Sequence, residues 1–230
     1  MEPYAQPTFA TRLRAHAREH GALDAAARLG RWGAGLAVPR GGSFELGGER
    51  YRLLRSLHGR TWTTERAVEV PVARRVLERH AGKRVLEVGN VLSHYGPVDH
   101  DVVDKYERAD GVENVDVLDL PARPEYDLVL TISTLEHVGR DEEPRDPTRA
   151  VAALEHLHRL LRPGGVLFAT VPVGYNPELD RALANGPYEL SAMRARPWRE
   201  VSSAEAFQCP YDFLVYSASA VLFASAQALP

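Results

Sequence analysis

The feature of this 230-residue chain that most restricts its fold is a regular alternation of short apolar segments with polar or helical connections. The apolar segments, all between residues 84 and 172, are RVLEVG, HDVVDKY, ENVDVLDL, YDLVLTIS and GVLFATVP. Strands that are apolar on both faces and are joined by helices form mostly parallel sheets with both faces covered. The sequence therefore predicts an α/β domain with a doubly wound, mostly parallel sheet of the Rossmann type.

Two further segments complete the predicted domain. The clearest helix lies in DPTRAVAALEHLHRLLRPGG, residues 146–165, because Asp-Pro favours a helix start and Gly-Gly a helix stop. HGRTWTTERAVEVPVARRVLERHAGK, residues 58–83, is typical of a loop that runs into a helix. CPYDFLVYSASAVLFASAQ, residues 209–227, is able to supply one or two closing strands.

The first sixty residues have a different character. Residues 9–37 are rich in Ala, Arg and Leu at helical spacing, which indicates one or two short amphipathic helices. VPRGGSFELGGERYRLL then alternates apolar and polar residues around Gly-Gly, which predicts a hairpin. We expect residues 1–60 to form a helical and hairpin lid, and residues 61–230 to form the ligand-binding domain.

Composition limits the classes of protein. With 44% hydrophobic and 26% charged residues, the chain can bury one sizeable core, and a net charge of −3 gives no general reason to bind nucleic acid. The single cysteine, Cys209, excludes an intramolecular disulfide and suits a reducing cytosol. No signal sequence is recognisable, and the longest apolar stretch is too short to span a bilayer. We expect a cytoplasmic monomer or homodimer without a nucleic-acid or membrane partner.

In a sheet of this kind the ligand lies at the carboxyl ends of the strands. Asp104 follows HDVV, where a carboxylate can accept hydrogen bonds from both hydroxyls of an adenosine ribose. An Asp at a strand end is also a common turn or cap residue. Because Gly89 and Asp116 stand at the neighbouring strand ends, the combination favours a nucleoside site.

Five segments occur in the order and spacing found in the class I S-adenosylmethionine-dependent methyltransferases, which the chain resembles over about residues 65 to 175: RVLEVGN, VVDKY, NVDVLDLP, YDLVLTISTLEHVG and LHRLLRPGGVLFATVP. A bacterial subgroup of these enzymes is more narrowly similar in ERAVEVP, EVGNVLSHY, VVDKYE, STLEHVG and GYNPELD. The resemblance implies an enzyme that uses S-adenosylmethionine. It favours a methyltransferase acting on a small molecule in bacterial biosynthesis.

The resemblance also implies roles for individual residues. Gly89 matches the first glycine of the cofactor loop, Asp104 the ribose-binding acid and Asp116 the adenine-contacting acid. The other residues expected around the cofactor are Glu87, Asn90, Ser93, Val117, Ser133 and Leu135, with Val117 offering a backbone N–H to the adenine.

The loop departs from the family pattern at two positions. Val91 and Ser93 stand where the family commonly has its second and third glycines, and side chains there restrict backbone approach to the cofactor. A pyrophosphate needs a close cradle of backbone amides, whereas S-adenosylmethionine has no phosphate. The two replacements therefore argue against a dinucleotide more than against S-adenosylmethionine.

Three residues are candidates for the chemistry. His137 is able to act as a general base or simply to pack, with Leu135, around the adenine and sulfur. Tyr175 could face the sulfonium or bind a substrate amine that Asn176 orients. The alternative for these two residues is an Asn-Pro turn with the tyrosine over the core.

The segment TWTTERAVEVP precedes the first core strand and carries the candidate substrate-binding residues Trp62, Glu65, Arg66 and Glu69. Its carboxylates could hold an ammonium group, and Arg66 could meet a carboxylate with two hydrogen bonds. A solvated helix start with acids near its positive end would look the same. The histidines lack the spacing of a zinc site, so we predict no metal.

Two other functions remain open at this stage. The cofactor's own amine could displace methylthioadenosine and close a small-ring amino acid, which would make the protein a cyclising enzyme. The chain could also bind the cofactor without catalysis. The products of incubation with S-adenosylmethionine distinguish the three cases.

Overall fold

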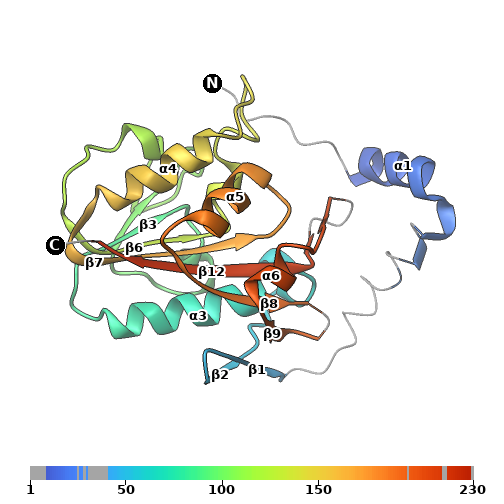
Figure 1. The fold of residues 1–230 in the computed structure, drawn as a ribbon, viewed down its shortest axis with the longest axis horizontal. Helices are drawn as coiled ribbons and strands as arrows, with labels where there is room; N and C mark the ends of the chain where they lie inside the picture. The colour runs from blue at the N-terminus through green and yellow to red at the C-terminus, as the bar shows by residue number, and fades with distance from the viewer. Residues whose placement is uncertain are drawn as a thin grey trace.

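The computed structural model describes residues 9–24, 26–27, 30, 41–195, 197–213 and 217–228. Its centre is an eight-stranded sheet with the order β5-β4-β3-β6-β7-β12-β8-β9 (Figure 1). The five neighbouring strands β5, β4, β3, β6 and β7 run parallel, and β12 runs antiparallel to both of its neighbours. The bounds are β3 Val85–Val88, β4 Asp101–Val103, β5 Val112–Glu113, β6 Tyr126–Ile132, β7 Leu161–Pro172, β8 Glu189–Arg194, β9 Arg199–Val201 and β12 Ala220–Gln227.

Helices cover both faces of the sheet. Helix α3 (Arg66–Arg79) lies on one face, and α4 (Arg149–His158) and α5 (Pro177–Asn185) lie on the other (Figure 1). Along β6, Leu128 and Leu130 belong to the hydrophobic cluster on the α3 side, whereas Val129 belongs to the cluster on the α4 side. Because both faces are buried, the strand has no polar alternation. The predicted doubly wound, mostly parallel fold is confirmed.

The amino-terminal part forms the predicted hairpin of β1 (Ser43–Leu46) and β2 (Glu49–Arg52), with Phe44 opposite Tyr51. The hairpin packs on α3, β8 and β9, and its Phe44 and Leu46 are buried. Helix α1 (Phe9–His20) stands apart from the sheet in Figure 1. Part of the predicted helical region, including residues 31–40, lies outside the described residues.

Helix α3 contains a proline in its interior. Pro71 has no N–H to donate to the carbonyl of Ala67, four residues earlier. That carbonyl instead accepts a hydrogen bond of 2.9 Å from the N–H of Leu54, which follows the hairpin. The missing helical bond thus provides an attachment point for the amino-terminal segment.

The third predicted strand is mostly wrong. Only Val112–Glu113 pairs in the sheet, and the chain then forms the 3-10 helix η4 (Val117–Asp119). The Asp116 carboxylate accepts a hydrogen bond of 3.0 Å from the N–H of Leu118 and so caps this turn. Short acidic side chains that bond to nearby backbone compete with strand pairing.

The region after β6 also differs from the expectation. Helix α4 ends at His158, before the Gly-Gly stop, and β7 starts at Leu161. The NPELD segment opens α5, because Asn176 caps the helix and Pro177 occupies its first turn. The remaining elements are η2 His58–Thr63, η3 Leu92–Tyr95, η5 Leu135–His137, α6 Ser203–Ala206, β10 Tyr211–Asp212 and β11 Ser217–Ala218.

The covered β6 strand generates a stability prediction. Leu130 is fully buried, so Leu130→Ala is expected to lower the free energy of unfolding by about 2–5 kcal/mol. The matched variant Leu57→Ala removes the same atoms from a residue that is 86% exposed, and it should stay within about 0.5 kcal/mol of the parent. Urea unfolding measures both. Equal effects of the two substitutions would contradict the buried position of β6.

Candidate active site

A cavity of about 620 Å³ lies at the carboxyl ends of β3, β4 and β6. Its volume falls within the range of small-molecule sites. The predicted site residues that line it are Arg66, Gly89, Asn90, Asp104, Asp116, Val117, Ser133 and His137. Those that do not line it are Trp62, Glu65, Glu69, Glu87, Ser93, Leu135, Tyr175 and Asn176. Lining residues that the sequence did not single out include His58, Tyr95, Lys105, Asp141 and Glu142.

Gly89 begins the loop after β3 and requires the absence of a side chain. Its φ of +87° lies in the left-handed region, and its N–H donates to the carbonyl of Val103 at 2.8 Å. A Cβ at this position would lie 2.1 Å from Oγ1 of Thr134. The glycine therefore lets the ends of β3 and β6 approach each other at the cavity.

Glu87 holds the same loop from behind. It is fully buried, and its Oε1 accepts the N–H groups of Val91 and Leu92, both at 2.9 Å. Its Oε2 lies 2.8 Å from Nε2 of His100. The backbone amides of Val91 and Leu92 thus point inward to a carboxylate. Val91 has a φ of −109° and Ser93 has no positive φ, so neither position requires a glycine. Glu87 shapes the loop and does not reach the cavity.

The other loop residues divide in the same way. Asn90 lines the cavity, and its Nδ2 donates to Glu107 at 2.8 Å. Ser93 is exposed and donates its hydroxyl to Oδ1 of Asn90. Ser93 therefore positions Asn90 instead of lining the cavity itself.

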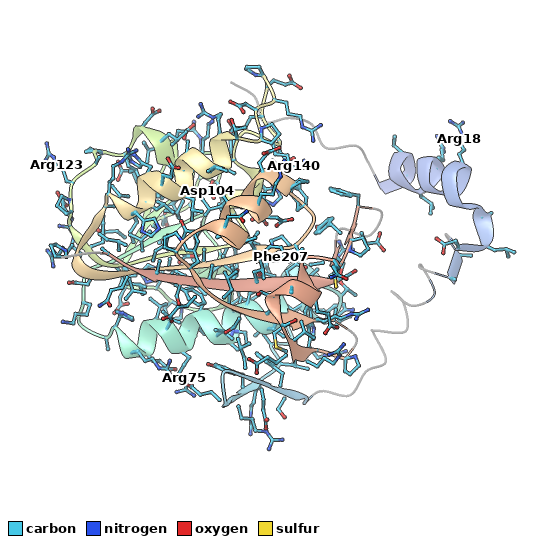
Figure 2. All side chains as sticks on the ribbon, viewed as in Figure 1. Arg18, Arg75, Asp104, Arg123, Arg140 and Phe207 are labelled. Atoms are coloured by element: carbon cyan, nitrogen blue, oxygen red, sulfur yellow. The ribbon has the colours of Figure 1, made fainter. Side chains whose placement is uncertain are left out.

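Asp104 forms part of the cavity wall at the end of β4 and lies within the body of the fold (Figure 2). Its Oδ1 accepts the N–H groups of Tyr106 and Glu107, at 2.8 and 2.7 Å. Its Oδ2 accepts the N–H of Asn90 at 3.2 Å. These bonds fix the carboxylate across from the β3 loop, and one lone pair, on Oδ2, remains available to a ligand.

Asp116 lies in a cluster of charges at the neighbouring strand end. Its Oδ2 is 2.8 Å from Nζ of Lys105 and 3.0 Å from Arg149, and Lys105 also lies 3.0 Å from Glu142. Burial opposes ionisation of Asp116, but the hydrogen bond and charge of Lys105 lower the pKa of this carboxyl below its ordinary value. An adenine ring contacting Asp116 has to share it with two cations.

The turn after β6 is held by α3. Arg66 donates to the carbonyls of Ile132 and Ser133, at 2.9 and 3.3 Å, and to Glu69 at 2.9 Å. Glu69 is fully buried and also accepts the hydroxyls of Ser133 and Thr170. Ser133 has a positive φ of 39°, an unfavourable conformation that this network maintains.

The structure corrects the expected position of three substrate-binding candidates on this segment. Glu69 serves the turn, and Glu65 accepts the N–H of Ala218 at 3.2 Å, behind the cavity. Burial raises the pKa of Glu65. The Trp62 ring packs against the Arg55 guanidinium, and its buried Nε1 has no hydrogen-bond partner among the described residues. Of the four candidates, Arg66 alone lines the cavity.

His137 lines the cavity and belongs to a chain of hydrogen bonds. Its Nδ1 is 2.6 Å from Oδ2 of Asp141, and the same oxygen accepts the hydroxyl of Tyr175 at 2.5 Å. Burial favours the neutral imidazole, but the hydrogen bond to Asp141 and the nearby Glu136 raise the pKa of His137 above its ordinary value. Asp141 lies in an irregular loop, where no sequence pattern marks it as a site residue.

Tyr175 and Asn176 are buried behind the cavity wall. Tyr175 is 1% exposed, and its ring lies edge-on to His137 with 4.7 Å between ring centres. The Asn176 amide accepts from two backbone N–H groups of α5 and donates to the carbonyls of Glu136 and Pro147. The structure thus gives Asn176 the helix-capping role, and it connects Tyr175 to the cavity through Asp141 and His137.

Glu136 is a buried acid next to this chain. Burial raises its pKa to about 8, and its Oε2 has no hydrogen-bond partner among the described residues. Its Oε1 lies 3.6 Å from Nε2 of His137.

No group of three or more His, Cys, Asp and Glu side chains within the described residues has a metal-binding arrangement. No helix in the same part of the chain has the length and apolar character needed to cross a membrane.

Comparison with family models and with curated proteins found no match. Among solved structures, the N-methyltransferase NodS of Bradyrhizobium japonicum with S-adenosylhomocysteine is similar, with TM-score 0.43, 16% identity, and coverage of 71% of this chain and 87% of that chain. A 1,6-didemethyltoxoflavin-N1-methyltransferase of Burkholderia thailandensis has TM-score 0.41, 19% identity, and coverage of 71% and 79%. These likenesses are too weak to assign an activity.

The raised pKa of Glu136 predicts a pH dependence of stability. A carboxyl with a pKa of about 8 in the folded state and 4.5 ordinarily contributes stability that is fully present below pH 4.5 and is lost as the pH rises to 8. Removing this group by Glu136→Gln should make the decline shallower, by up to about 1.4 kcal/mol per pH unit.

Urea unfolding between pH 5 and 8 measures the slope. Glu155→Gln, at an exposed position of α4, is the control and should keep the parent slope. If Glu136→Gln also keeps the parent slope, Glu136 is ionised in the folded protein at neutral pH.

Proposed function

We propose that the protein is an S-adenosylmethionine-dependent methyltransferase that acts on a small molecule. The observation that supports this best is the pairing of Gly89 and Asp104 at adjacent strand ends on one cavity wall. A carboxylate in this position can accept a ribose hydroxyl at Oδ2, and the glycine allows close approach of a ligand. The match of the sequence motifs to this methyltransferase family supports the same reading.

The cavity suits S-adenosylmethionine chemically. Asp104 would hold the ribose, and Asp116 with the backbone of Val117 would meet the adenine. Apolar walls from Val88, Val117 and Val138 suit the ring. The inward-facing amides of the β3 loop leave no cradle for a pyrophosphate, and S-adenosylmethionine contains no pyrophosphate. When bound, it supplies an electrophilic methyl group, and the chain supplies alignment and exclusion of water.

We also propose that residues 1–60 act as a lid over the site. His58 and Gly59 line the cavity, and His58 stacks on His94 with 4.1 Å between ring centres. The end of the amino-terminal segment therefore already forms part of the wall.

Product analysis is the direct test of the function. Purified protein is incubated with S-adenosylmethionine and small-molecule acceptors, and the nucleoside products are identified by mass spectrometry. S-adenosylhomocysteine supports methyl transfer. Methylthioadenosine would support ring closure of the cofactor. If neither product forms, the chain is a domain that binds the cofactor without catalysis.

The ribose assignment predicts a specific loss of affinity. Asp104→Asn should weaken S-adenosylhomocysteine binding by about tenfold to several hundredfold, because hydrogen bonds to a charged carboxylate contribute about 1.5–3 kcal/mol. Asp119→Asn makes the same change at an exposed acid outside the cavity and should bind normally. Calorimetry measures both variants. Unchanged affinity in a folded Asp104→Asn protein would contradict the assignment.

The lid proposal predicts a change in hydrogen exchange. Saturating S-adenosylhomocysteine should slow amide exchange within residues 1–60 as well as in the β3 and β4 loops, because closure excludes water. Exchange followed by mass spectrometry locates the protection. Protection confined to residues 85–135 would refute the lid.

A further inference from the structure

His137, Asp141 and Tyr175 form an arrangement that the proposed function does not yet use. Resting on that proposed function, we propose that His137 is the general base for an acceptor with an aromatic hydroxyl, and that Asp141 and Tyr175 are positioning residues that hold the base. His137 has a hydrogen-bond chain on Nδ1, an open Nε2, and the ring of Tyr175 against its own ring.

The hydrogen-bond chain determines which nitrogen of His137 is basic. An ionised carboxylate only accepts hydrogen bonds, so the Nδ1 that lies 2.6 Å from Asp141 carries the proton. Nε2 is then the basic nitrogen of the neutral ring. The Tyr175 hydroxyl donates to the same Asp141 oxygen at 2.5 Å and restrains the carboxylate.

Nε2 is available to a ligand. His137 lines the cavity, and 41% of its side chain is exposed. Oε1 of Glu136 lies 3.6 Å from Nε2, which is beyond hydrogen-bond distance. An acceptor in the cavity can therefore present a hydroxyl to this nitrogen.

The charged groups around His137 favour its protonated form. Asp141 and Glu136 raise the pKa of the imidazole, while burial and the Arg66 guanidinium lower it. Arg140 lies over the far ring, 5.2 Å from the centre of Tyr175. The Asp141 carboxylate thus stabilises the imidazolium that forms when the base takes a proton, whereas the positive charges of Arg66 and Arg140 oppose it.

Aromatic side chains extend from this point. Tyr175 contacts Tyr211 and Phe213, with 4.9 and 5.4 Å between ring centres, and Phe213 is 42% exposed. Aromatic rings pack favourably edge-to-face or offset. Neither Tyr211 nor Phe213 lines the cavity, so these rings support Tyr175, which in turn contacts the ring of His137.

Proton affinity selects the kind of hydroxyl. A neutral amine needs no base before it attacks, and an aliphatic hydroxyl is too weak an acid for imidazole. A phenol, with a pKa near 10, lies only a few units from an imidazolium. The phenol can therefore transfer its proton to His137, which leaves a phenolate beside an imidazolium.

The proposed step transfers a methyl group from sulfur to the acceptor oxygen and a proton from that oxygen to His137. The acceptor O–H bond breaks, and its proton goes to Nε2 of His137. The acceptor oxygen forms a bond to the methyl carbon of S-adenosylmethionine as the carbon–sulfur bond breaks, and that electron pair stays on sulfur. The products are an aryl methyl ether, S-adenosylhomocysteine and an imidazolium that releases its proton to water.

A chromogenic phenol tests the proposal without turnover. 4-Nitrophenol is titrated spectrophotometrically in the presence of protein saturated with S-adenosylhomocysteine. Because a cation within about 4–6 Å lowers the pKa of an acid by 1–3 units, the bound probe should show the phenolate band at least one pH unit lower than the free probe. 4-Nitroaniline, of the same shape, should bind more weakly.

Three variants assign the effect to residues. His137→Gln should abolish the shift in the pKa of the bound phenol. Asp141→Asn should lower the fraction of bound phenolate at least about threefold. Tyr175→Phe keeps the ring and should give a phenolate fraction between those of Asp141→Asn and the parent protein. Methyl transfer to an identified phenol should fall about 10²- to 10⁴-fold in His137→Gln. His158→Gln and Tyr188→Phe disrupt a similar His–Tyr contact of 3.2 Å outside the cavity and should keep the parent shift.

The outcomes separate the two levels of inference. If S-adenosylhomocysteine binds but 4-nitrophenol does not, or binds without a shift, the hydroxyl acceptor is refuted and the methyltransferase proposal stands. If the shift persists in a folded His137→Gln protein, His137 is not the base. If S-adenosylhomocysteine fails to bind the parent protein, the proposed function itself fails.

Discussion

The buried carboxylate of Glu69 is the contact on which the site depends. It joins α3 to the ends of β6 and β7 by accepting from Arg66, Ser133 and Thr170. A buried charge is tolerated only when it is paired and fully hydrogen-bonded, so these elements must assemble together. This arrangement holds the unusual turn at Ser133, which leads directly into the cavity residues Thr134 and His137.

Acidic groups have separate tasks in this fold. Glu87 and Glu69 are interior and organise loops, whereas Asp104 and Asp116 stand on the cavity wall. Only the wall acids are candidates for ligand contact. Glu87 holds the β3 loop through the N–H groups of Val91 and Leu92, and the loop needs a glycine only at Gly89, where φ is positive.

Much of the fold could be predicted because β3, β6 and β7 are apolar on both faces, a pattern that few architectures satisfy. Gly89 and Asp104 were expected at the ends of their strands and lie there, whereas Asp116 lies beyond the short β5 as the cap of η4. The third strand was overestimated because a cap at Asp116 competes with pairing. Asp141 could not be predicted, since its contact with His137 arises in an irregular loop. The burial of Tyr175 behind the cavity wall could not be predicted either, because it depends on the three-dimensional packing of its neighbours.

The turn closed by Asp104 has a thermodynamic consequence. Its three backbone hydrogen bonds exist before any ligand arrives, so the conformational entropy of residues 104–107 is lost during folding. A ligand that meets this carboxylate does not have to order the segment again. Part of its affinity is therefore supplied by the stability of the fold, and a change that loosens this turn weakens binding without removing a single atom that touches the ligand.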